Sequence, residues 1–371
     1  MSDILIVTFE AGGNVLPALG IGRELHRRGH RVRVLGHAMQ QSQIESAGLE
    51  FRAYRNSPTW RPHDQLSTWT VLTMGITMVT APGVGQDLRD EVRADPADLV
   101  VVDCMLFNAL DAAAREGLRH VALFHTFYAM FYGSFRRGPF GIVARTKGLG
   151  PRRVWHGSDL ELVCSDPAFD PAARDGAGRT NGHVVWTGAV HEVREAAVGR
   201  TPPRVLASLS TAGFAGQRRT LQNILDAVEG ADVELVVTTG PSVDPAGFRV
   251  PPNASVHRYV PHNELMPECS AVIGHGGHAT TFRALAHGLP MLIMPMSPLT
   301  DQPAVGKAVA DAGAGKVLRR TAGPDKIRDA IDDLVHSKRY RTAAAALGTR
   351  IRGADGAAAA ADRLLALVDS P

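Results

Sequence analysis

Short apolar runs alternate with amphipathic segments along this chain, and the alternation occurs in two blocks. In the first block, strands are expected at 4–9, 31–35, 99–103 and 120–124. In the second block, strands are expected at 205–208, 233–238, 255–257, 271–274 and 291–294. Runs with so few polar residues are typical of strands covered on both faces, as in a parallel sheet. The pattern therefore predicts an α/β protein with two Rossmann-like, doubly wound parallel-sheet domains.

The segment 187–203 separates the two blocks and closes with two prolines. This composition is typical of a linker, because proline lacks an amide donor and stiffens the chain. We therefore expect one domain over 1–186 and a second over 204–353. The Ala-rich end, 354–371, is predicted to form a helix that packs back towards the N-terminal domain.

Composition removes several classes of protein from consideration. The chain has 371 residues, more than one core usually supports, and its 44% hydrophobic and 21% charged residues exclude disordered and collagen-like proteins. The 40 Lys and Arg exceed the 37 Asp and Glu by 3, so charge gives no reason to expect nucleic-acid binding. Three widely spaced cysteines favour a reducing cytoplasm over a disulfide framework. We expect neither a leader nor a membrane span, since no apolar stretch reaches about 20 residues. The oligomeric state stays open, a homodimer included.

An aromatic cluster stands out: seven of the 21 aromatic residues fall between Phe124 and Phe140. One interpretation is a core helix, because aromatic residues at helical spacing usually pack in a core. The other is a pocket wall, because these rings cover too wide an arc for one buried face. On the second interpretation, an apolar small molecule would be contacted by Gly13, Trp60, Met74, Phe127, Tyr128, Phe131 and Tyr132.

The most informative motif is AVIGHGGHATTFRALAHGLP, residues 271–290. It runs from an apolar strand through a Gly-Gly turn into a helix. Glycine lets the backbone approach a ligand, and the first turn of a helix presents unpaired N–H groups and a partial positive charge. We expect an anion site here, although an ordinary turn with incidental glycines is the alternative. The residues concerned are His275, Gly276, Gly277, Thr280 and Thr281.

Polar residues also follow other strands of the second block. Asp301 and Gln302 come after the apolar run MLIMPM, and a carboxylate beside an amide suits sugar hydroxyls. Ligands bind at the carboxyl ends of strands in such sheets. Further side chains at these ends are Ser210, Thr211, Tyr259, Val260 and His262.

The ordered series RVLASLST, VVTTGP, RYVPHNELMP, HGGHATTFRALAHGLP and PMSPLTDQP resembles that of inverting GT-B-fold glycosyltransferases that act on natural products. The N-terminal GGNVLPALGIGRELHRRGHRV and the DLVVVD run are similar to the same family. The resemblance extends over nearly the whole chain. It implies that the two domains face each other across a cleft, with an acceptor bound by 1–186 and a nucleotide-sugar by 204–353. The implied reaction moves a sugar, or a deoxysugar, from a TDP- or UDP-carrier to a hydrophobic acceptor, with no cofactor besides that co-substrate.

The same resemblance implies roles for the residues of the second domain. His275 and the neighbouring glycine backbone would hold the diphosphate, Val260 the pyrimidine and Ser210 the far side of the phosphates. Asp301 would hold sugar hydroxyls together with its neighbour. Ala279 departs from the family, which often has glycine there, but it keeps the backbone N–H. The full implied donor set is Ser210, Thr211, Tyr259, Val260, His262, His275, Gly276, Gly277, Thr280, Thr281, Asp301 and Gln302.

The general base is the open question in the first domain. Many relatives carry a histidine in a first-loop GHVxP motif, whereas this chain reads GNVLP, with Asn14 at that position. An amide orients a hydroxyl but does not accept its proton at neutral pH. Asp103 and His125, each at a predicted strand end, are the remaining candidates, and we place Asp103 slightly ahead because the matching acid partners the histidine in relatives. Both have structural alternatives: Asp103 as a helix cap and His125 as an ordinary buried histidine.

We expect no metal in the reaction, because no Asp-x-Asp motif ends a strand and a helix terminus can supply the positive charge. The absence of a Glu-x7-Glu arrangement after the phosphate loop favours inversion. The first turn lacks GxGxxG, which disfavours a NAD enzyme. Two alternatives to a transferase stay open: an auxiliary or binding relative, suggested by Asn14, and a nucleotide-sugar epimerase.

Overall fold

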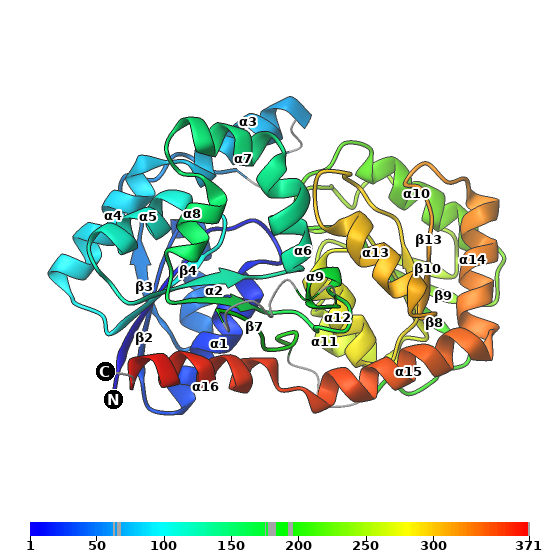
Figure 1. Ribbon diagram of the computed structural model, residues 1–371. Helices are drawn as coiled ribbons and strands as arrows, with labels where there is room; N and C mark the ends of the chain where they lie inside the picture. Colours follow the sequence, from blue (N-terminus) through cyan, green and yellow to red (C-terminus); the bar gives the residue numbers. More distant parts are fainter. Residues whose placement is uncertain (62–63, 65–67, 175, 177–182, 192–195, 370–371) are drawn as a thin grey trace. The chain divides into compact units, whose positions relative to one another are not determined.

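The computed structural model describes residues 1–61, 64, 68–174, 176, 183–191 and 196–369. The chain divides into two compact units (Figure 1). The first comprises Met1–Arg61, Thr68–Val190 and Asp355–Pro371, and the second is built on His191–Ala354. The segment expected as a linker therefore divides between the units after Val190, and its residues 192–195 lie outside the described residues.

The first unit holds a seven-stranded parallel sheet in the order β3-β2-β1-β4-β5-β6-β7. Its strands are β1 (Asp3–Val7), β2 (Arg31–Gly36), β3 (Glu50–Ala53), β4 (Leu99–Asp103), β5 (His120–Phe124), β6 (Leu160–Val163) and β7 (Val184–Trp186). Its helices are α1 (Val15–Arg27), η1 (Ala38–Gln40), α2 (Gln41–Ser46), α3 (Thr68–Val79), α4 (Pro82–Ala94), α5 (Phe107–Arg115), α6 (Tyr128–Met130), η2 (Phe131–Phe135), α7 (Pro139–Thr146), α8 (Pro151–His156), α9 (Pro171–Arg174) and α16 (Gly356–Val368).

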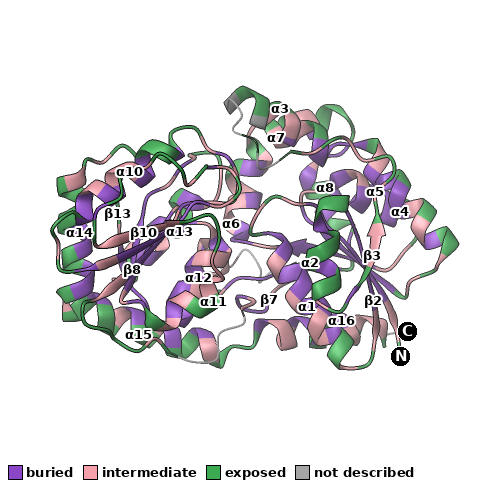
Figure 2. Ribbon diagram, turned by 180° about the vertical axis from the view of Figure 1, so that it is seen from behind, coloured by how far each residue is buried: buried purple, intermediate pink, exposed green. Residues whose placement is uncertain are grey.

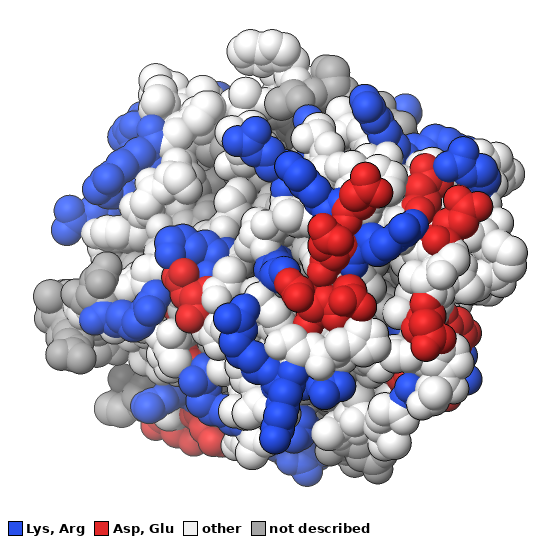
Figure 3. Space-filling model, turned by 90° about the vertical axis from the view of Figure 1, so that its right-hand side faces the viewer, with Lys and Arg blue, Asp and Glu red and all other residues white. Residues whose placement is uncertain are grey.

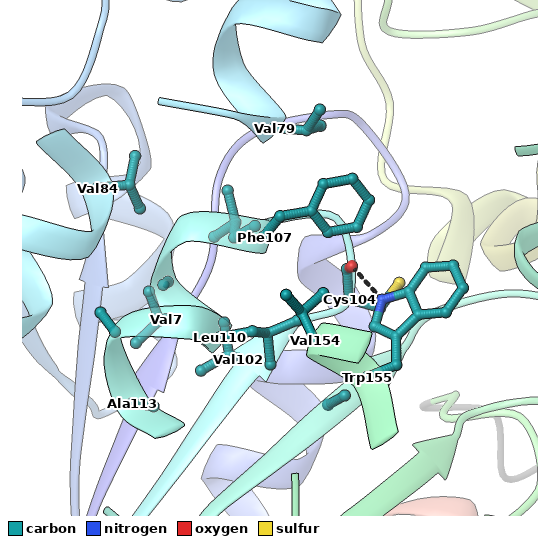
Figure 4. Packing of buried hydrophobic residues seen from close by; sticks show 14 of the residues in the cluster. Val7, Val79, Val84, Val102, Cys104, Phe107, Leu110, Ala113, Val154 and Trp155 are labelled. Carbon is teal, nitrogen blue, oxygen red and sulfur yellow. Dashed lines mark hydrogen bonds between the residues drawn. The ribbon is translucent and has the colours of Figure 1, made fainter. Parts of the chain in front are cut away.

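Alternate residues of these strands pack on opposite faces of the sheet. On one face, Val7 and Val102 lie against α5 and α8, where Phe107 and Trp155 fill the layer (Figure 4). On the other face, Ile6 belongs to a second cluster that includes buried residues of α1 and α16. Burying one such aliphatic side chain contributes about 1.5–3 kcal/mol, so the doubly covered strands anchor this unit.

The C-terminal helix α16 completes the first unit by packing on α1 (Figure 1). Its small residues permit a close approach, because a Cβ at Gly356 would lie 2.6 Å from the carbonyl oxygen of Ala189. Asp355 caps the helix by accepting a hydrogen bond of 3.0 Å from the amide of Ala358. Arg28, which directly follows α1, forms an ion pair with Asp362 of α16, with 2.5 Å between Nη1 and Oδ1.

A buried ion-pair cluster ties β2 to its surroundings. The side chain of Arg33 is fully buried. Its guanidinium contacts Asp3 Oδ1 and Glu91 Oε1, each at 2.7 Å. Charges taken out of water are tolerated when they are paired in this way. The apolar pattern of the strand alone does not show this polar interior.

The second unit holds a six-stranded parallel sheet in the order β10-β9-β8-β11-β12-β13. Its strands are β8 (Arg204–Ser208), β9 (Glu234–Thr238), β10 (Ala254–His257), β11 (Ala271–Gly274), β12 (Met291–Ile293) and β13 (Gly315–Val317). Its helices are α10 (Gln217–Val228), α11 (His262–Leu265), η3 (Met266–Glu268), α12 (His278–Ala286), α13 (Gln302–Asp311), α14 (Pro324–His336) and α15 (Lys338–Gly353). The sequence prediction of two parallel-sheet α/β domains is confirmed.

In both units the strands are mostly buried, and the helices expose one side (Figure 2). Basic and acidic side chains lie among each other over much of the face in Figure 3, in keeping with the near balance of charge. Among the residues described, no helix is long and apolar enough to cross a membrane.

Candidate active site

Three polar residues meet at one edge of the first sheet. β4 lies between β1 and β5, and parallel strands end at the same edge. Asp103 ends β4, His125 follows β5 directly, and Asn14 follows the loop after β1. The strand order reverses between β1 and β4, which is where ligands bind in doubly wound sheets. The topology therefore brings together the three residues for which the sequence suggested a catalytic role.

The carboxylate of Asp103 is the centre of this group. Its Oδ2 lies 3.0 Å from Nδ2 of Asn14, which donates to it, and 3.2 Å from Nδ1 of His125. The contact with His125 falls outside hydrogen-bond geometry but within ion-pair distance. Only 3% of the Asp103 side chain and 13% of the His125 side chain are exposed. A buried carboxylate therefore lies beside the imidazole of His125, and the imidazole can accept a proton at Nε2.

Asn14 fixes the first loop as well as the carboxylate. Its Nδ2 also donates to the carbonyl of Phe9 at 2.9 Å, and its Oδ1 accepts from the amide of Ala11 at 2.9 Å. The side chain is buried, whereas Gly13 beside it is exposed. Asn14 therefore positions Asp103 and the loop, and its amide has no proton-accepting role.

Asp103 does not cap the helix that follows it. Its Oδ1 accepts from the amide of Met105 at 2.9 Å, which closes a turn before α5, and Leu106 is the cap residue of that helix. Trp155 holds the same turn, because its indole N–H donates to the carbonyl of Cys104 at 2.7 Å (Figure 4). The helix-cap alternative for Asp103 is thus wrong, and the turn is braced from two sides.

Cys104 lies close to both catalytic candidates. Atoms of Asp103, Cys104 and His125 lie within 4.8 Å of one another, a spacing that a metal ion could bridge. Burial, aided by the neighbouring carboxylate, raises the pKa of the Cys104 thiol well above its ordinary value. A protonated thiol is a poor ligand. The group therefore fits an acid–base pair better than a metal centre.

The aromatic cluster mostly fills the core. Phe127, Tyr128 and Phe131 are at most 2% exposed, so these three do not form the open pocket wall that the sequence suggested. The segment passes from α6 into the π-helical turn η2, whose i→i+5 pattern is wider than that of an α-helix, so its rings are not confined to one α-helical face. Buried Asp170 anchors the segment by accepting from the amide of Tyr128 at 2.7 Å.

Three residues expected to contact the acceptor keep partly open surfaces. Tyr132 is half-buried and stacks on Tyr128, with ring centroids 5.3 Å apart. Trp60 is half-buried, packs edge-on against Phe9 at 5.6 Å, and donates its indole N–H to the carbonyl of Glu10 in the first loop. Met74 of α3 is half-buried. Trp60 therefore lies beside the loop that carries Asn14, and the acceptor role of these residues stays a prediction.

The turn between β11 and α12 has the geometry of an anion site. Gly276 has a φ of +87°, and a Cβ there would lie 2.7 Å from the backbone oxygen of Gln302. A Cβ at Gly277 would lie 2.5 Å from Nε2 of His275. The backbone at Gly276 therefore requires glycine, and a side chain at Gly277 would have to displace the His275 imidazole that lies over it. Gly277 is the cap residue of α12, whose first amides remain for an anion.

Side chains around this turn match the expected chemistry. Burial lowers the pKa of His275 to about 4, so its ring is neutral at pH 7 and offers one N–H donor. The hydroxyl of Thr281 is buried and has no hydrogen-bond partner among the described residues. Thr280 is half-buried. Buried polar groups are normally paired, so the Thr281 hydroxyl calls for a further hydrogen-bond partner.

Other predicted donor residues lie at neighbouring strand ends of the same sheet. Ser210 is half-buried and its Oγ accepts from the amide of Ala212 at 3.0 Å, while Thr211 is exposed. Burial lowers the pKa of His262 to about 4, and its Nε2 lies 3.3 Å from the hydroxyl of Thr238. Of the remaining two, Val260 is half-buried and Tyr259 is 76% exposed.

Gln302 has a structural role that its residue type does not reveal. The side chain is buried, and its Oε1 accepts from the amides of Met296 at 2.7 Å and Ser297 at 3.1 Å. The oxygen therefore holds the loop before α13 and is not free for a sugar hydroxyl, which leaves Nε2 for that role. Asp301 is half-buried at the start of α13.

Sequence reasoning missed several residues of the first unit. Trp155 and Asp170 brace the site, but a tryptophan and an aspartate far apart in the chain give no pattern. Glu161, His156 and His183 form a further cluster, with a charged residue in an otherwise apolar strand as the single available signal.

Comparison with known proteins places this geometry in context. Residues 222–366 match the family model of the erythromycin biosynthesis protein CIII-like C-terminal domain. An uncharacterized UDP-glucosyltransferase, YojK of Bacillus subtilis, is 23% identical over 99% of this chain and 98% of its own length. The 4'-demethylrebeccamycin synthase of Lentzea aerocolonigenes is 24% identical over 98% of this chain and 99% of its own.

Solved structures give the same picture of the fold. The glycotransferase of kitacinnamycin superposes with a TM-score of 0.78 at 21% identity, covering 99% of this chain and 98% of that one. The glycosyltransferase VinC, in complex with dTDP, superposes with a TM-score of 0.74 at 20% identity and covers 99% of both chains. Likeness at these identities is evidence for the shared two-domain fold.

Proposed function

We propose that the chain is a member of the UDP-glycosyltransferase-like family of GT-B-fold transferases and that it moves a sugar from a TDP- or UDP-carrier to an apolar small molecule. A deoxysugar is included among the donors. The observation that carries the proposal is the His125–Asp103 pair, with 3.2 Å between Nδ1 and Oδ2. It supplies the proton acceptor that Asn14 cannot supply.

In the proposed reaction the acceptor hydroxyl gives its proton to Nε2 of His125 while its oxygen attacks the anomeric carbon. Asp103 orients the imidazole and stabilises the imidazolium that forms. The bond between the anomeric carbon and the diphosphate oxygen breaks in the same step, so the configuration inverts. We give His125 the role of base and Asp103 the role of its positioning partner, reversing the order favoured by sequence alone.

The second unit is proposed to bind the nucleotide-sugar. The leaving diphosphate gains negative charge, and the first amides of α12 with the His275 N–H would stabilise it. The hydroxyl of Thr281, which has no partner among the described residues, would add a further donor. These groups provide charge stabilisation without a metal ion, which supports metal-independent transfer.

Relatives and neighbours point to the donor and acceptor classes. One solved neighbour holds dTDP, one curated relative is named a UDP-glucosyltransferase, and another is named for synthesis of a demethylrebeccamycin. We therefore propose a pyrimidine diphosphate carrier and a natural-product acceptor. Cys104, Cys164 and Cys269 are buried free thiols, which supports action in a reducing cytoplasm.

The test is a transfer assay with the purified chain, pairing TDP- and UDP-sugars with hydrophobic aglycones. Release of nucleoside diphosphate that depends on the aglycone supports transfer, and NMR of the anomeric proton reads the configuration of the product. Chelator should leave the rate unchanged. Diphosphate binding by calorimetry without transfer on any aglycone would favour an auxiliary role, and no nucleotide binding at all would refute the donor site.

A further inference from the structure

Three potential metal ligands converge beside β6, and none of them has a role in the proposed reaction. Glu161 is the second residue of β6, His156 ends α8, and His183 directly precedes β7. The amide of Glu161 donates to the carbonyl of His183 at 2.8 Å, so the β6–β7 pairing sets the relative position of two of the three. The cluster therefore joins three segments of the first unit.

The distances between the potential ligand atoms are compatible with a metal site. Nδ1 of His156 lies 2.7 Å from Oε1 of Glu161, and Nε2 of His183 lies 3.7 Å from the same oxygen. All three lie within 4.8 Å of one another. Two ligand atoms about 2.05 Å from a tetrahedral ion are about 3.3 Å apart, a value between the two distances seen here.

The carboxylate at the centre is fully buried and poorly satisfied. Glu161 is 0% exposed, and neither of its oxygens makes a hydrogen bond of acceptable geometry with a described residue. The hydroxyl of Tyr128 lies beside it but outside that geometry. Nε2 of His183 is likewise buried and without a partner among the described residues. Buried polar groups are normally paired, so this set calls for a further partner.

The residue types indicate that this missing partner is a metal ion. Two imidazoles and one carboxylate are a ligand set of zinc sites that keep a fourth position open. We propose that His156, Glu161 and His183 bind one divalent transition-metal ion, with Zn²⁺ the best match, and that the ion ties α8 to the β6–β7 edge.

None of the three ligands takes part in the proposed transfer, and His156 lies beside Tyr132, with ring centroids 6.4 Å apart. His156 is 40% exposed and His183 24%, whereas Nε2 of His183 and both carboxylate oxygens of Glu161 are buried, so the exposed side of the cluster is at His156. The competing explanation is a simple His156–Glu161 ion pair, in which His183 is a bystander. The metal site requires His183 as a ligand, whereas the ion pair does not, and the experiment tests this difference. The sequence expectation of no metal concerned the reaction, so a structural ion at this cluster does not contradict it.

The test uses the full chain without an affinity tag, stripped with chelator and titrated with Co²⁺ and then Zn²⁺. One equivalent of Co²⁺ should give the visible absorption of a tetrahedral site, displaced by Zn²⁺, with a rise in Tm. Glu161→Gln and His183→Ala should each weaken binding by at least about tenfold, since even the groups that only support metal ligands are worth 10–100-fold. His257→Ala, at an exposed histidine of β10, is the matched control and should bind normally.

Cys104→Ser distinguishes this site from the Asp103–Cys104–His125 group. A thiolate ligand adds a near-ultraviolet sulfur-to-cobalt band, which should be absent from the wild-type spectrum and unaffected by the substitution. Binding that survives both Glu161→Gln and His183→Ala would overturn the proposal. So would the absence of any Co²⁺ spectrum, or loss of binding in Glu161→Gln with none in His183→Ala, which is the pattern of an ion pair.

Discussion

Replacing His125 with glutamine should nearly abolish transfer while leaving donor binding intact. Glutamine has a similar size and polarity but cannot accept the proton of the acceptor hydroxyl. A positioned general base contributes about 10²–10⁴-fold to a rate, so kcat should fall by that factor. The KM for the nucleotide-sugar should change little, because the donor residues belong to the second unit.

The contribution of Asp103 can be worked from the same geometry. At the 3.2 Å between Oδ2 and Nδ1, opposite unit charges in an effective dielectric of about 20 attract by about 5 kcal/mol. The partial exposure of the His125 side chain makes this an upper limit. Asp103→Asn removes the charge but keeps the shape of the side chain, so we expect kcat to fall by about 10²–10³-fold. Because Asp103 acts through His125, adding Asp103→Asn to the His125→Gln variant should lower kcat little further.

A rescue experiment separates a base from a merely structural histidine. Adding Asn14→His to the His125→Gln variant returns an imidazole to the contact with Oδ2 of Asp103, and part of the lost kcat should return. His120→Gln is the control, because it changes a buried histidine at the opposite end of β5. The assay is initial-rate kinetics from pH 5 to 9. If His125→Gln keeps more than about a third of the wild-type kcat, the assignment is refuted.

Three other outcomes are expected. Replacing His275 with Ala removes one hydrogen bond to a charged group, worth about 1.5–3 kcal/mol, so the donor KM should rise about 10- to 100-fold in steady-state kinetics; an unchanged KM would exclude His275 from the donor site. Arg33→Met removes a fully buried guanidinium from Asp3 and Glu91, which keep their contacts with Arg31 and Arg52, and should lower the free energy of unfolding by about 1.5–3 kcal/mol in urea titrations, with a loss under about 0.5 kcal/mol contradicting a stabilising role of this ion-pair cluster. Acidification should also destabilise the protein: burial lowers the pKa of His37, His262 and His275 to about 4, from an ordinary 6.5. The unfolded chain binds these protons first, so each histidine's contribution, at most about 3 kcal/mol, is full above pH 6.5 and is lost towards pH 4. Urea midpoints measured stepwise between pH 7.5 and 4.5 check this, and His37→Gln should flatten the curve.

Much of the fold could be predicted because the central strands are covered on both faces. All five residues of β4 and of β5 are buried, and such strands appear in the sequence as unbroken apolar runs. The pattern failed at β3 and β13, which are edge strands with mixed burial and only three or four residues. It also failed at β6, where Glu161 interrupts the apolar run.

Only part of the candidate site could be predicted from the sequence, and the reason differs from that for the fold. The turn at His275 could be predicted because its glycines, its strand and its helix are adjacent in sequence. The contact of Asp103 with His125 depends on strand order, which the apolar pattern does not specify. The aromatic segment misled because its spacing was interpreted with α-helical periodicity, whereas η2 is a π-helical turn. The role of Gln302 depends on where its Oε1 points, which no residue type reveals.

In the proposed reaction, the position of Asp103 allows the base to differ from the family pattern. β4 has β1 on one side and β5 on the other, so its terminal carboxylate is reached both from the first loop and from the end of β5. Here both neighbours use the same oxygen, Oδ2, with Asn14 donating from one side and His125 contacting it from the other. Exchanging the two residue types would move the imidazole from the β5 side of this oxygen to the β1 side, while the carboxylate stays fixed. The acceptor hydroxyl must then approach from the β5 side, which makes the half-buried Tyr132 that follows β5 the first residue to vary when acceptor choice is tested.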